Sequence, residues 1–108
     1  MKVLFICSKN KWRSLTAEKI FERNHNFHVR SAGTENGARM KVNSGHIGWA
    51  DVIFVMEKKH ERRLQQKFGQ ELYGKKMIRL DIPDDYSYMD EELIEMLTNR
   101  VFEYIEID

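Results

Sequence analysis

Short apolar runs, separated by longer stretches rich in charge, recur along this chain. Residues 3–6 and 51–56 hold runs of aliphatic and aromatic side chains, which are typical of buried strands. Residues 27–31 alternate apolar and polar side chains as a half-buried strand does, and Ala32-Gly33-Thr34 is expected to end it. Residues 76–80 are expected to form a fourth strand.

The segments between these runs carry apolar residues at helical spacing. A helix is expected from Ser14 onward, with an apolar face made by Leu15, Ala17, Ile20 and Phe21. Residues 57–68 predict another helix, whose inward positions recur every four residues at His60, Leu64 and Phe68. A last helix over about residues 90–105 has an apolar stripe of Leu93, Ile94, Leu97, Val101, Tyr104 and Ile105. A short, poorly patterned helix is expected within residues 38–49.

The alternation of strands and helices predicts an α/β fold of right-handed βαβ units, with a parallel sheet covered on both faces. The 108 residues contain one proline and six scattered glycines and no linker or repeat, so one domain is expected to span residues 1–108. Ligands of such sheets bind beyond the carboxyl ends of the strands, where the strand order reverses. The loop after the first strand is therefore the first place to look for a site.

Charge and cysteine content exclude several classes of protein. Lys plus Arg number 18 and Asp plus Glu 17, a net charge of +1, so neither nucleic acid nor an anionic membrane is expected as the main partner. Cys7 is the only cysteine, which excludes an internal disulfide, and no apolar run is long enough for a signal peptide or a membrane span. A cytoplasmic protein with a free thiol is expected. The histidines show no metal-ligand spacing, so no metal or other cofactor is expected, and the charged residues 57–63 are expected to form a solvated helix face.

The loop after the first strand carries the most distinctive chemistry of the chain. It reads Cys7-Ser8-Lys9-Asn10-Lys11-Trp12-Arg13-Ser14. Successive backbone N–H groups in such a C-x5-R loop can surround an oxyanion, and the following helix adds the positive end of its dipole. The same field favours a thiolate at Cys7, and Arg13 offers a bidentate fork for two phosphoryl oxygens. Ser14 can donate its hydroxyl to the sulfur. The bare spacing is a weak signal, and a buried cysteine that ends a core strand is the alternative.

This loop and its flanks resemble a known family. Residues 3–7, Asn10, Arg13-Ser14 and Ala17-Glu18 are similar to the amino-terminal signature of the low-molecular-weight protein tyrosine phosphatases. Three later stretches agree in order, at residues 31–34, 50–57 and 82–86. The resemblance implies a flavodoxin-like fold with a four-stranded parallel sheet, and a phosphocysteine intermediate.

The resemblance also implies roles for the residues of the loop. Cys7 would be the nucleophile and Arg13 the phosphate clamp. Asn10 would hold the loop in its strained shape, since asparagine tolerates left-handed backbone angles, and Ser14 would stabilise the thiolate. The remaining loop residues would bind the phosphate and support the loop: Ser8, Lys9, Lys11 and Trp12.

Members of this family protonate the leaving phenolate with the aspartate of an Asp-Pro-Tyr triplet. Asp84-Asp85-Tyr86 stands in that place here, so Asp84 is the first candidate for the general acid, Asp85 the second and Asp81 the third. A general acid typically contributes about 10² to 10⁴ in rate. The alternative is that these aspartates only shape the turn before the last helix.

The loop departs from the family pattern at three positions. Lys9 stands where glycine is common, Trp12 where a second cysteine often sits, and Leu15 where proline is usual. Without that second cysteine, Cys7 is expected to be open to irreversible over-oxidation.

Aromatic residues near the loop suit an aryl substrate, because a flat ring needs apolar walls. Trp12 and Tyr86 are expected to be such walls. Trp49 is expected to pack in the core, and the role of Tyr88 is left open.

These features predict a phosphatase that hydrolyses phosphotyrosine in proteins, or small aryl phosphates, through phosphorylated Cys7. A non-catalytic phosphate-binding module and a phosphocarrier on the same fold are the alternatives, and arsenate reduction would need an external thiol. The sequence leaves open the physiological substrate, the oligomeric state, the choice between Asp84 and Asp85, and the effect of Lys9 and Trp12 on turnover.

Overall fold

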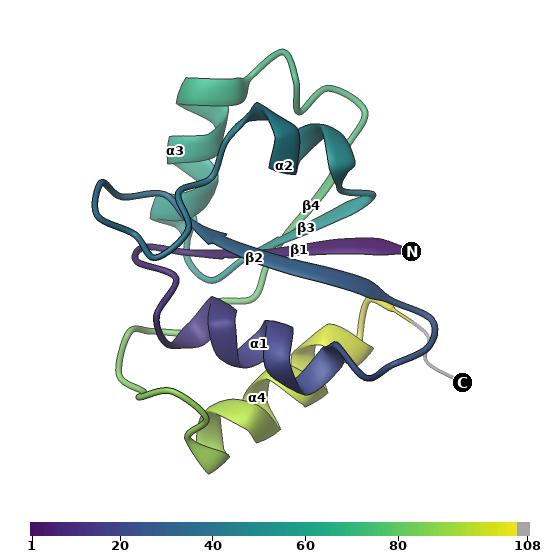
Figure 1. The fold of residues 1–108 in the computed structure, drawn as a ribbon, viewed down its shortest axis with the longest axis vertical. Helices are drawn as coiled ribbons and strands as arrows, with labels where there is room; N and C mark the ends of the chain where they lie inside the picture. Colours follow the sequence, from purple (N-terminus) through teal and green to yellow (C-terminus); the bar gives the residue numbers. More distant parts are fainter. Residues whose placement is uncertain (106–108) are drawn as a thin grey trace.

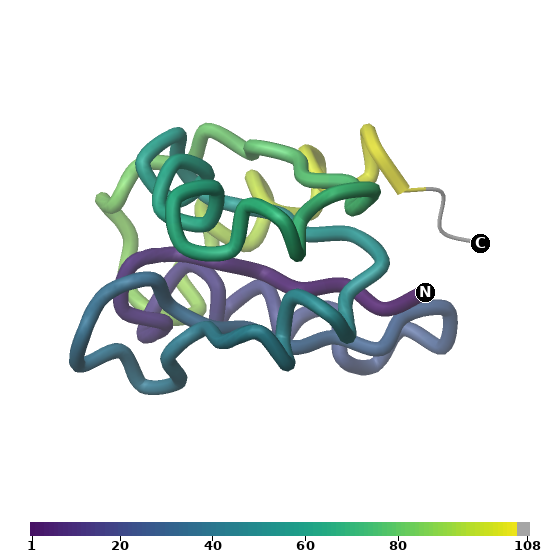
Figure 2. The backbone as a smooth tube through the Cα atoms, turned by 90° about the horizontal axis from the view of Figure 1, so that it is seen from above, coloured from purple at the N-terminus to yellow at the C-terminus, as the bar shows by residue number. Residues whose placement is uncertain are grey.

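The computed structural model describes residues 1–105, in which four parallel strands alternate with four helices. The strands are β1 (Lys2–Cys7), β2 (His28–Gly33), β3 (Val52–Val55) and β4 (Lys76–Arg79), and they lie in the order β2-β1-β3-β4. Figure 2 shows β1, in purple, running through the middle of the molecule. The predicted α/β class and its flavodoxin-like arrangement are confirmed.

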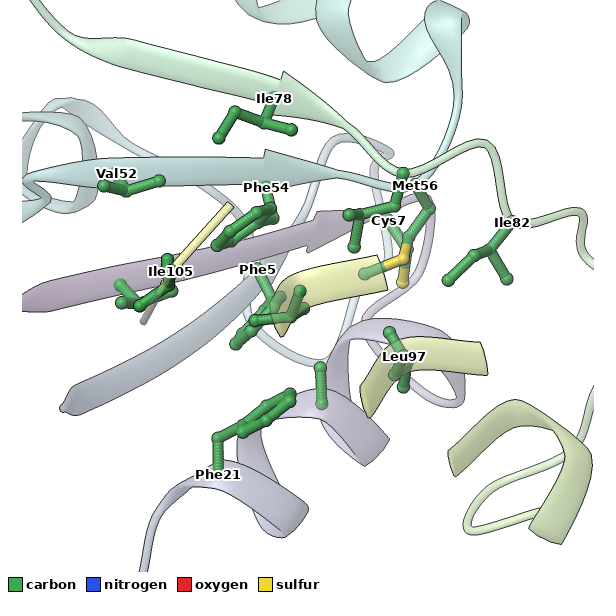
Figure 3. Packing of buried hydrophobic residues seen from close by; sticks show 14 of the residues in the cluster. Phe5, Cys7, Phe21, Val52, Phe54, Met56, Ile78, Ile82, Leu97 and Ile105 are labelled. Atoms are coloured by element: carbon green, nitrogen blue, oxygen red, sulfur yellow. The ribbon is translucent and has the colours of Figure 1, made fainter. Parts of the chain in front are cut away.

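Helices cover both faces of the sheet. α1 (Arg13–Phe21) and α4 (Glu91–Phe102) lie on one face, and α2 (Ser44–Trp49) and α3 (Lys58–Phe68) on the other (Figure 1). Successive residues of β1 and β3 point to opposite faces, so each strand contributes side chains to two separate cores. The core under α1 and α4 includes Val3, Phe5, Cys7, Val52, Phe54 and Met56, and Figure 3 shows Cys7 beside Met56. The core under α2 and α3 includes Leu4, Ile6, Ile53 and Val55.

Strand β2 extends further than predicted at its carboxyl end. Ala32 and Gly33 were expected to end the strand, but they continue the parallel register opposite Ile6 and Cys7. Hydrogen bonding to β1 therefore overrides the tendency of glycine to end a strand, and it brings Gly33 against the beginning of the loop.

The apolar face predicted for α1 is partly wrong. Leu15 and Ile20 are only half-buried, whereas Thr16 is completely buried and its hydroxyl accepts a hydrogen bond from the backbone N–H of Met89 at 2.9 Å. The segment before α4 packs on this side of α1, a contact that spacing within one helix does not reveal.

The other helices lie close to their predicted positions. The inward positions of α3, at His60, Leu64 and Phe68, are confirmed. Helix α4 ends at Phe102, earlier than predicted, and Tyr104 beyond it is exposed.

The strand order reverses beside β1, because β2 lies on one side of it and β3 on the other. At this edge of the sheet the loops after β1, β3 and β4 meet. The Arg13 side chain joins them, since it hydrogen-bonds to Glu57 after β3 and to the carbonyl oxygen of Ile82 after β4. The fold therefore gathers three loops where doubly wound sheets bind their ligands.

Candidate active site

The loop after β1 is held from its outer side by the segment that follows β2. Four successive carbonyl oxygens, those of residues 7–10, accept hydrogen bonds from this segment. The donors are the backbone N–H groups of Thr34, Glu35 and Arg39 and the Arg39 Nε atom, at 2.9 to 3.3 Å. The carbonyl groups of residues 7–10 therefore point outward, toward this segment.

Outward carbonyls turn the amide hydrogens inward. In a planar trans peptide the N–H group points away from the C=O group, and residues 1–105 contain no cis peptide. The N–H of Asn10 lies 3.3 Å from Cys7 Sγ. Within the described chain, the N–H groups of Ser8, Lys9, Lys11 and Trp12 have no protein acceptor. Such a ring of free amide donors around a sulfur atom is a nest suited to an anion.

Two backbone positions make this loop possible. Asn10 has φ of 57°, the left-handed conformation that the sequence predicted for it. At position 33 a Cβ atom would lie 2.5 Å from the carbonyl oxygen of Ser8 and 2.8 Å from Ala38 Cβ, so only glycine allows β2 to approach the loop this closely.

The sulfur of Cys7 has a buried hydroxyl beside it. Ser14 Oγ lies 2.9 Å from Cys7 Sγ and 2.7 Å from Asn10 Nδ2. Because the amide of Asn10 donates to the Ser14 oxygen, the Ser14 hydroxyl retains its own proton for the sulfur. The predicted contact between Ser14 and Cys7 is present, and a hydrogen bond donated by the Ser14 hydroxyl to the sulfur stabilises a thiolate.

Arg13 is almost completely buried, and one end of its guanidinium is anchored. Its Nη1 atom donates to Glu57 Oε2 at 2.5 Å and to the Ile82 carbonyl oxygen at 2.8 Å. The Nε atom lies 3.7 Å from Asp84 Oδ1. Within residues 1–105 neither Nε nor Nη2 makes a hydrogen bond, because the contact between Nε and Asp84 is too long for one, so this edge can bind two oxygens of an anion.

Glu57 supplies the negative charge that holds Arg13. Burial alone would raise the pKa of Glu57, but the hydrogen bond and the charge of Arg13 outweigh burial and hold that pKa below its usual value. The carboxylate therefore stays ionised at neutral pH and fixes the guanidinium. The expectation that this residue lies on a solvated helix face is wrong, because β3 delivers it to the shared edge of the sheet.

A small cavity opens above the loop. Its volume is about 150 Å³, and its lining residues are Cys7, Ser8, Lys9, Lys11, Trp12, Arg13 and Asp84. The structure thus brings together the predicted nucleophile, phosphate clamp and general acid. The indole of Trp12, 48% exposed, stands at the cavity as one predicted aromatic wall.

Other predicted residues do not line this cavity. Tyr86 does not reach it and instead packs half-buried against the core under α1 and α4. Asp85 is exposed and also outside it, and Asp81 pairs with Arg79 at 2.7 Å beside a different hollow. Of the three candidate acids, only Asp84 lines the cavity that Cys7 also lines.

Trp49 packs half-buried against the core under α2 and α3, in line with its predicted packing role. The Arg30 guanidinium lies 4.4 Å from the centre of the Trp49 ring, a contact that was not predicted.

Sequence reasoning missed the part that the first turn of α3 plays at this site. Glu57 binds Arg13, and His60 Nε2 lies 2.9 Å from Ser8 Oγ. The available signal was the position of Glu57 directly after a buried strand, at the edge where sites form.

Within residues 1–105, no three or more His, Cys, Asp or Glu side chains are arranged to hold a metal ion. Over the same range, no helix has the length and apolar character needed to cross a membrane.

Comparison with known proteins bears on this geometry. Residues 2–47 match the family model described as low molecular weight phosphotyrosine protein phosphatase, which confirms the resemblance found in the sequence. This match includes the whole loop and its anchoring segment after β2. No curated protein sequence matches the chain.

Solved structures share the fold along nearly the whole chain. The tyrosine phosphatase Wzb from Escherichia coli K30, in complex with phosphate, has a TM-score of 0.75 and 21% identity over 95% of this chain and 94% of its own. Wzb from Vibrio vulnificus, in complex with benzylphosphonate, has a TM-score of 0.68 and 25% identity over 92% and 90%. The YwlE arginine phosphatase from Geobacillus stearothermophilus has a TM-score of 0.71 and 19% identity over 94% and 90%. The matched family and these neighbours are phosphatases.

Proposed function

We propose that this chain, whose residues 2–47 match the low-molecular-weight phosphatases, is itself a cysteine-dependent phosphatase that hydrolyses phosphotyrosine in proteins or small aryl phosphates. One observation supports this proposal most strongly. The loop turns a ring of free amide donors toward Cys7 Sγ, and the buried Arg13 stands at the end of this loop. Backbone donors and a guanidinium that are already in place stabilise the equatorial oxygens of a phosphoryl group in transit.

In the first step the Cys7 thiolate attacks phosphorus and the bond from phosphorus to the phenolic oxygen breaks. The carboxyl group of Asp84 gives its proton to the leaving oxygen, since it lines the same cavity as Cys7. The free edge of Arg13 follows two phosphoryl oxygens as they become planar. The products are a phenol and phosphorylated Cys7.

In the second step water attacks phosphorus and the bond between sulfur and phosphorus breaks. Asp84, now a carboxylate, takes a proton from the water, and inorganic phosphate is released. The thiolate leaves with the hydroxyl of Ser14 donating to it from 2.9 Å. Asn10 keeps that hydroxyl in the donating orientation, because its amide occupies the Ser14 oxygen.

An aryl substrate fits the cavity better than a phosphorylated guanidinium does. The indole of Trp12 offers an apolar wall, and Lys9 and Lys11 add positive charge to the lining. A second guanidinium in the substrate would be repelled by these cations, whereas a phenol ring would stack on the indole. Phosphotyrosine is therefore expected to be turned over faster than phosphoarginine.

The competing function is binding of phosphate without turnover, either as a phosphate-binding module or as a phosphocarrier. Both functions need the ring of amide donors around Cys7, but only hydrolysis needs a proton donor such as Asp84 in the cavity. The presence of Asp84 in the lining favours hydrolysis.

Purified protein assayed on p-nitrophenyl phosphate between pH 4 and 8, with vanadate as competitor, tests the proposal. Turnover that vanadate inhibits, and that Cys7→Ser abolishes while the fold is retained, is the expected result. Binding of phosphate or vanadate with no hydrolysis would instead support the binding module, and activity retained in Cys7→Ser would overturn the nucleophile.

A further inference from the structure

His60 is a completely buried titratable residue that the proposed reaction does not use. It stands in the first turn of α3, and both of its ring nitrogens have partners. Nδ1 lies 3.0 Å from the backbone nitrogen of Glu57, and Nε2 lies 2.9 Å from Ser8 Oγ. The imidazole therefore connects α3 to the loop that surrounds Cys7.

The partners of His60 fix which nitrogen carries the proton. A backbone N–H group can only donate, so Nδ1 must accept from Glu57 and is unprotonated. Burial, and then the charge of Arg13, lower the pKa of His60 to about 4, so the ring is neutral at neutral pH. Its single proton is consequently on Nε2, which donates to Ser8 Oγ.

This assignment determines what the Ser8 hydroxyl can do. The Ser8 oxygen already accepts a hydrogen bond from His60 Nε2. Within residues 1–105, no acceptor is bonded to the proton of the Ser8 hydroxyl. Ser8 lines the cavity beside Cys7, so the available proton lies where phosphoryl oxygens would be bound. The Ser8 hydroxyl is thus fixed as a donor by a group behind it, as Asn10 fixes Ser14.

We propose that Ser8 is a phosphoryl-binding side chain and that His60 is its positioning residue. The proposal rests on the function proposed above, and it adds a side-chain donor to the backbone amides and Arg13. His60 acts only through Ser8, since it does not line the cavity. The simpler reading is that His60 only fills the core and closes the first turn of α3 through Glu57.

Two near-isosteric substitutions separate these readings. An asparagine side chain places its oxygen near the position of imidazole Nδ1, so His60→Asn can keep the bond from the Glu57 N–H but does not reach Ser8. A glutamine side chain reaches the position of Nε2, so His60→Gln can keep the donor to Ser8 but loses the bond to Glu57. Ser8→Ala removes the hydroxyl and leaves the histidine in place.

The experiment measures kcat and KM on p-nitrophenyl phosphate, the affinity for inorganic phosphate by calorimetry, and thermal unfolding for each variant. We expect Ser8→Ala and His60→Asn each to lower kcat/KM by about tenfold and to weaken phosphate binding, since a lost donor to a charged acceptor has about this effect. His60→Gln is expected to keep activity near that of the unsubstituted protein. In the Ser8→Ala background, His60→Asn should cause no further loss, because the two residues act in series.

A reversed pattern, with His60→Asn active and His60→Gln impaired, would overturn the proposal and support the structural reading. Full activity in Ser8→Ala would also overturn it, whether or not the His60 variants fold. An unsubstituted protein that shows no turnover defeats the proposed function first; phosphate binding in that protein then still tests Ser8 and His60 by calorimetry alone.

Discussion

At the scale of single residues, the position of the carboxylates favours Asp84 as the proposed general acid. Asp84 lines the cavity above the loop, 3.7 Å from Arg13 Nε, whereas the neighbouring Asp85 does not. Asp84→Asn is expected to lower kcat by about 10² or more, because the leaving phenolate loses its proton donor. Steady-state kinetics against pH check this, and the alkaline limb of the profile should flatten, because Asp84 must be protonated to act as the acid.

Asp85→Asn is the matched control, since it removes the same charge one residue along the chain. Its kcat is expected to stay within about twofold of the unsubstituted protein. A large loss of kcat in Asp85→Asn together with a small loss in Asp84→Asn would assign the role of general acid to Asp85.

The neutral, buried state of His60 predicts a dependence of stability on pH. Its pKa falls from 6.5 to about 4 on folding, chiefly because burial disfavours the charged ring and Arg13 repels it. Between these two values the unfolded chain binds more protons than the folded one, so stability rises with pH. The contribution is fully present above about pH 6.5 and is lost as the pH falls toward 4, with a size on the order of 3 kcal/mol.

Urea unfolding of the unsubstituted protein and of His60→Gln at several values between pH 4.5 and 7.5 checks this prediction. Carboxylates titrate in both proteins, so the informative quantity is the difference between their free energies of unfolding. That difference should favour the unsubstituted protein more at pH 7 than at pH 4.5. A difference that does not vary with pH would show that His60 does not stay neutral in the fold.

At the scale of elements, the approach of β2 to the loop after β1 sets the site. A methyl group at position 33 would lie 2.5 Å from a backbone oxygen, so Gly33→Ala must displace the loop or the strand. We expect this substitution to destabilise the protein by about 1–3 kcal/mol and to reduce kcat/KM more than a mere loss of stability would. Thermal unfolding and kinetics well below the melting temperature separate the two effects.

Gly48→Ala in α2 is the corresponding control. Nothing lies within 4 Å of a Cβ built at that position, and alanine favours a helix over glycine by up to about 1 kcal/mol. Stability should rise or stay unchanged, and activity should not change. Equal losses at both positions would mean that glycine content, rather than the contact with the loop, is what matters.

The element scale is also where the sequence was most and least informative. Apolar patterning located the four strands and the helices α1, α3 and α4, because these elements bury residues of their own, as α3 does with Leu64 and Phe68. The short helix α2 has no clear pattern and was placed only within residues 38–49. Apolar patterning missed the extension of β2 to Gly33 and the burial of Thr16, which depend on partners distant in sequence.

The loop residues lie together in one motif, so the sequence could name them. The contacts of Glu57 with Arg13 and of His60 with Ser8 join residues that are distant in sequence, so it could not predict these contacts.

At the scale of the whole molecule, a near-neutral net charge conceals an uneven distribution. The formal charge is +1, yet the cavity lining holds Lys9, Lys11 and Arg13 against a single acidic residue, Asp84. Lys9 donates to the carbonyl oxygen of Asn36, whereas Lys11 has no hydrogen-bond or ion-pair partner within residues 1–105. The local field at the cavity mouth is therefore positive, and it attracts a dianionic substrate.

Lys11→Gln tests how much that field contributes. We expect kcat/KM for an aryl phosphate to fall severalfold at low salt and to depend less steeply on ionic strength, because one steering charge is lost at the mouth. Lys67→Gln, near the end of α3 on the other face of the sheet, removes the same formal charge away from the cavity and should change neither quantity. Equal effects in both variants would mean that net charge alone attracts the substrate. An unchanged Lys11→Gln variant would mean that the amide ring and Arg13 suffice, since these fixed groups act on the bound phosphoryl group rather than on its approach.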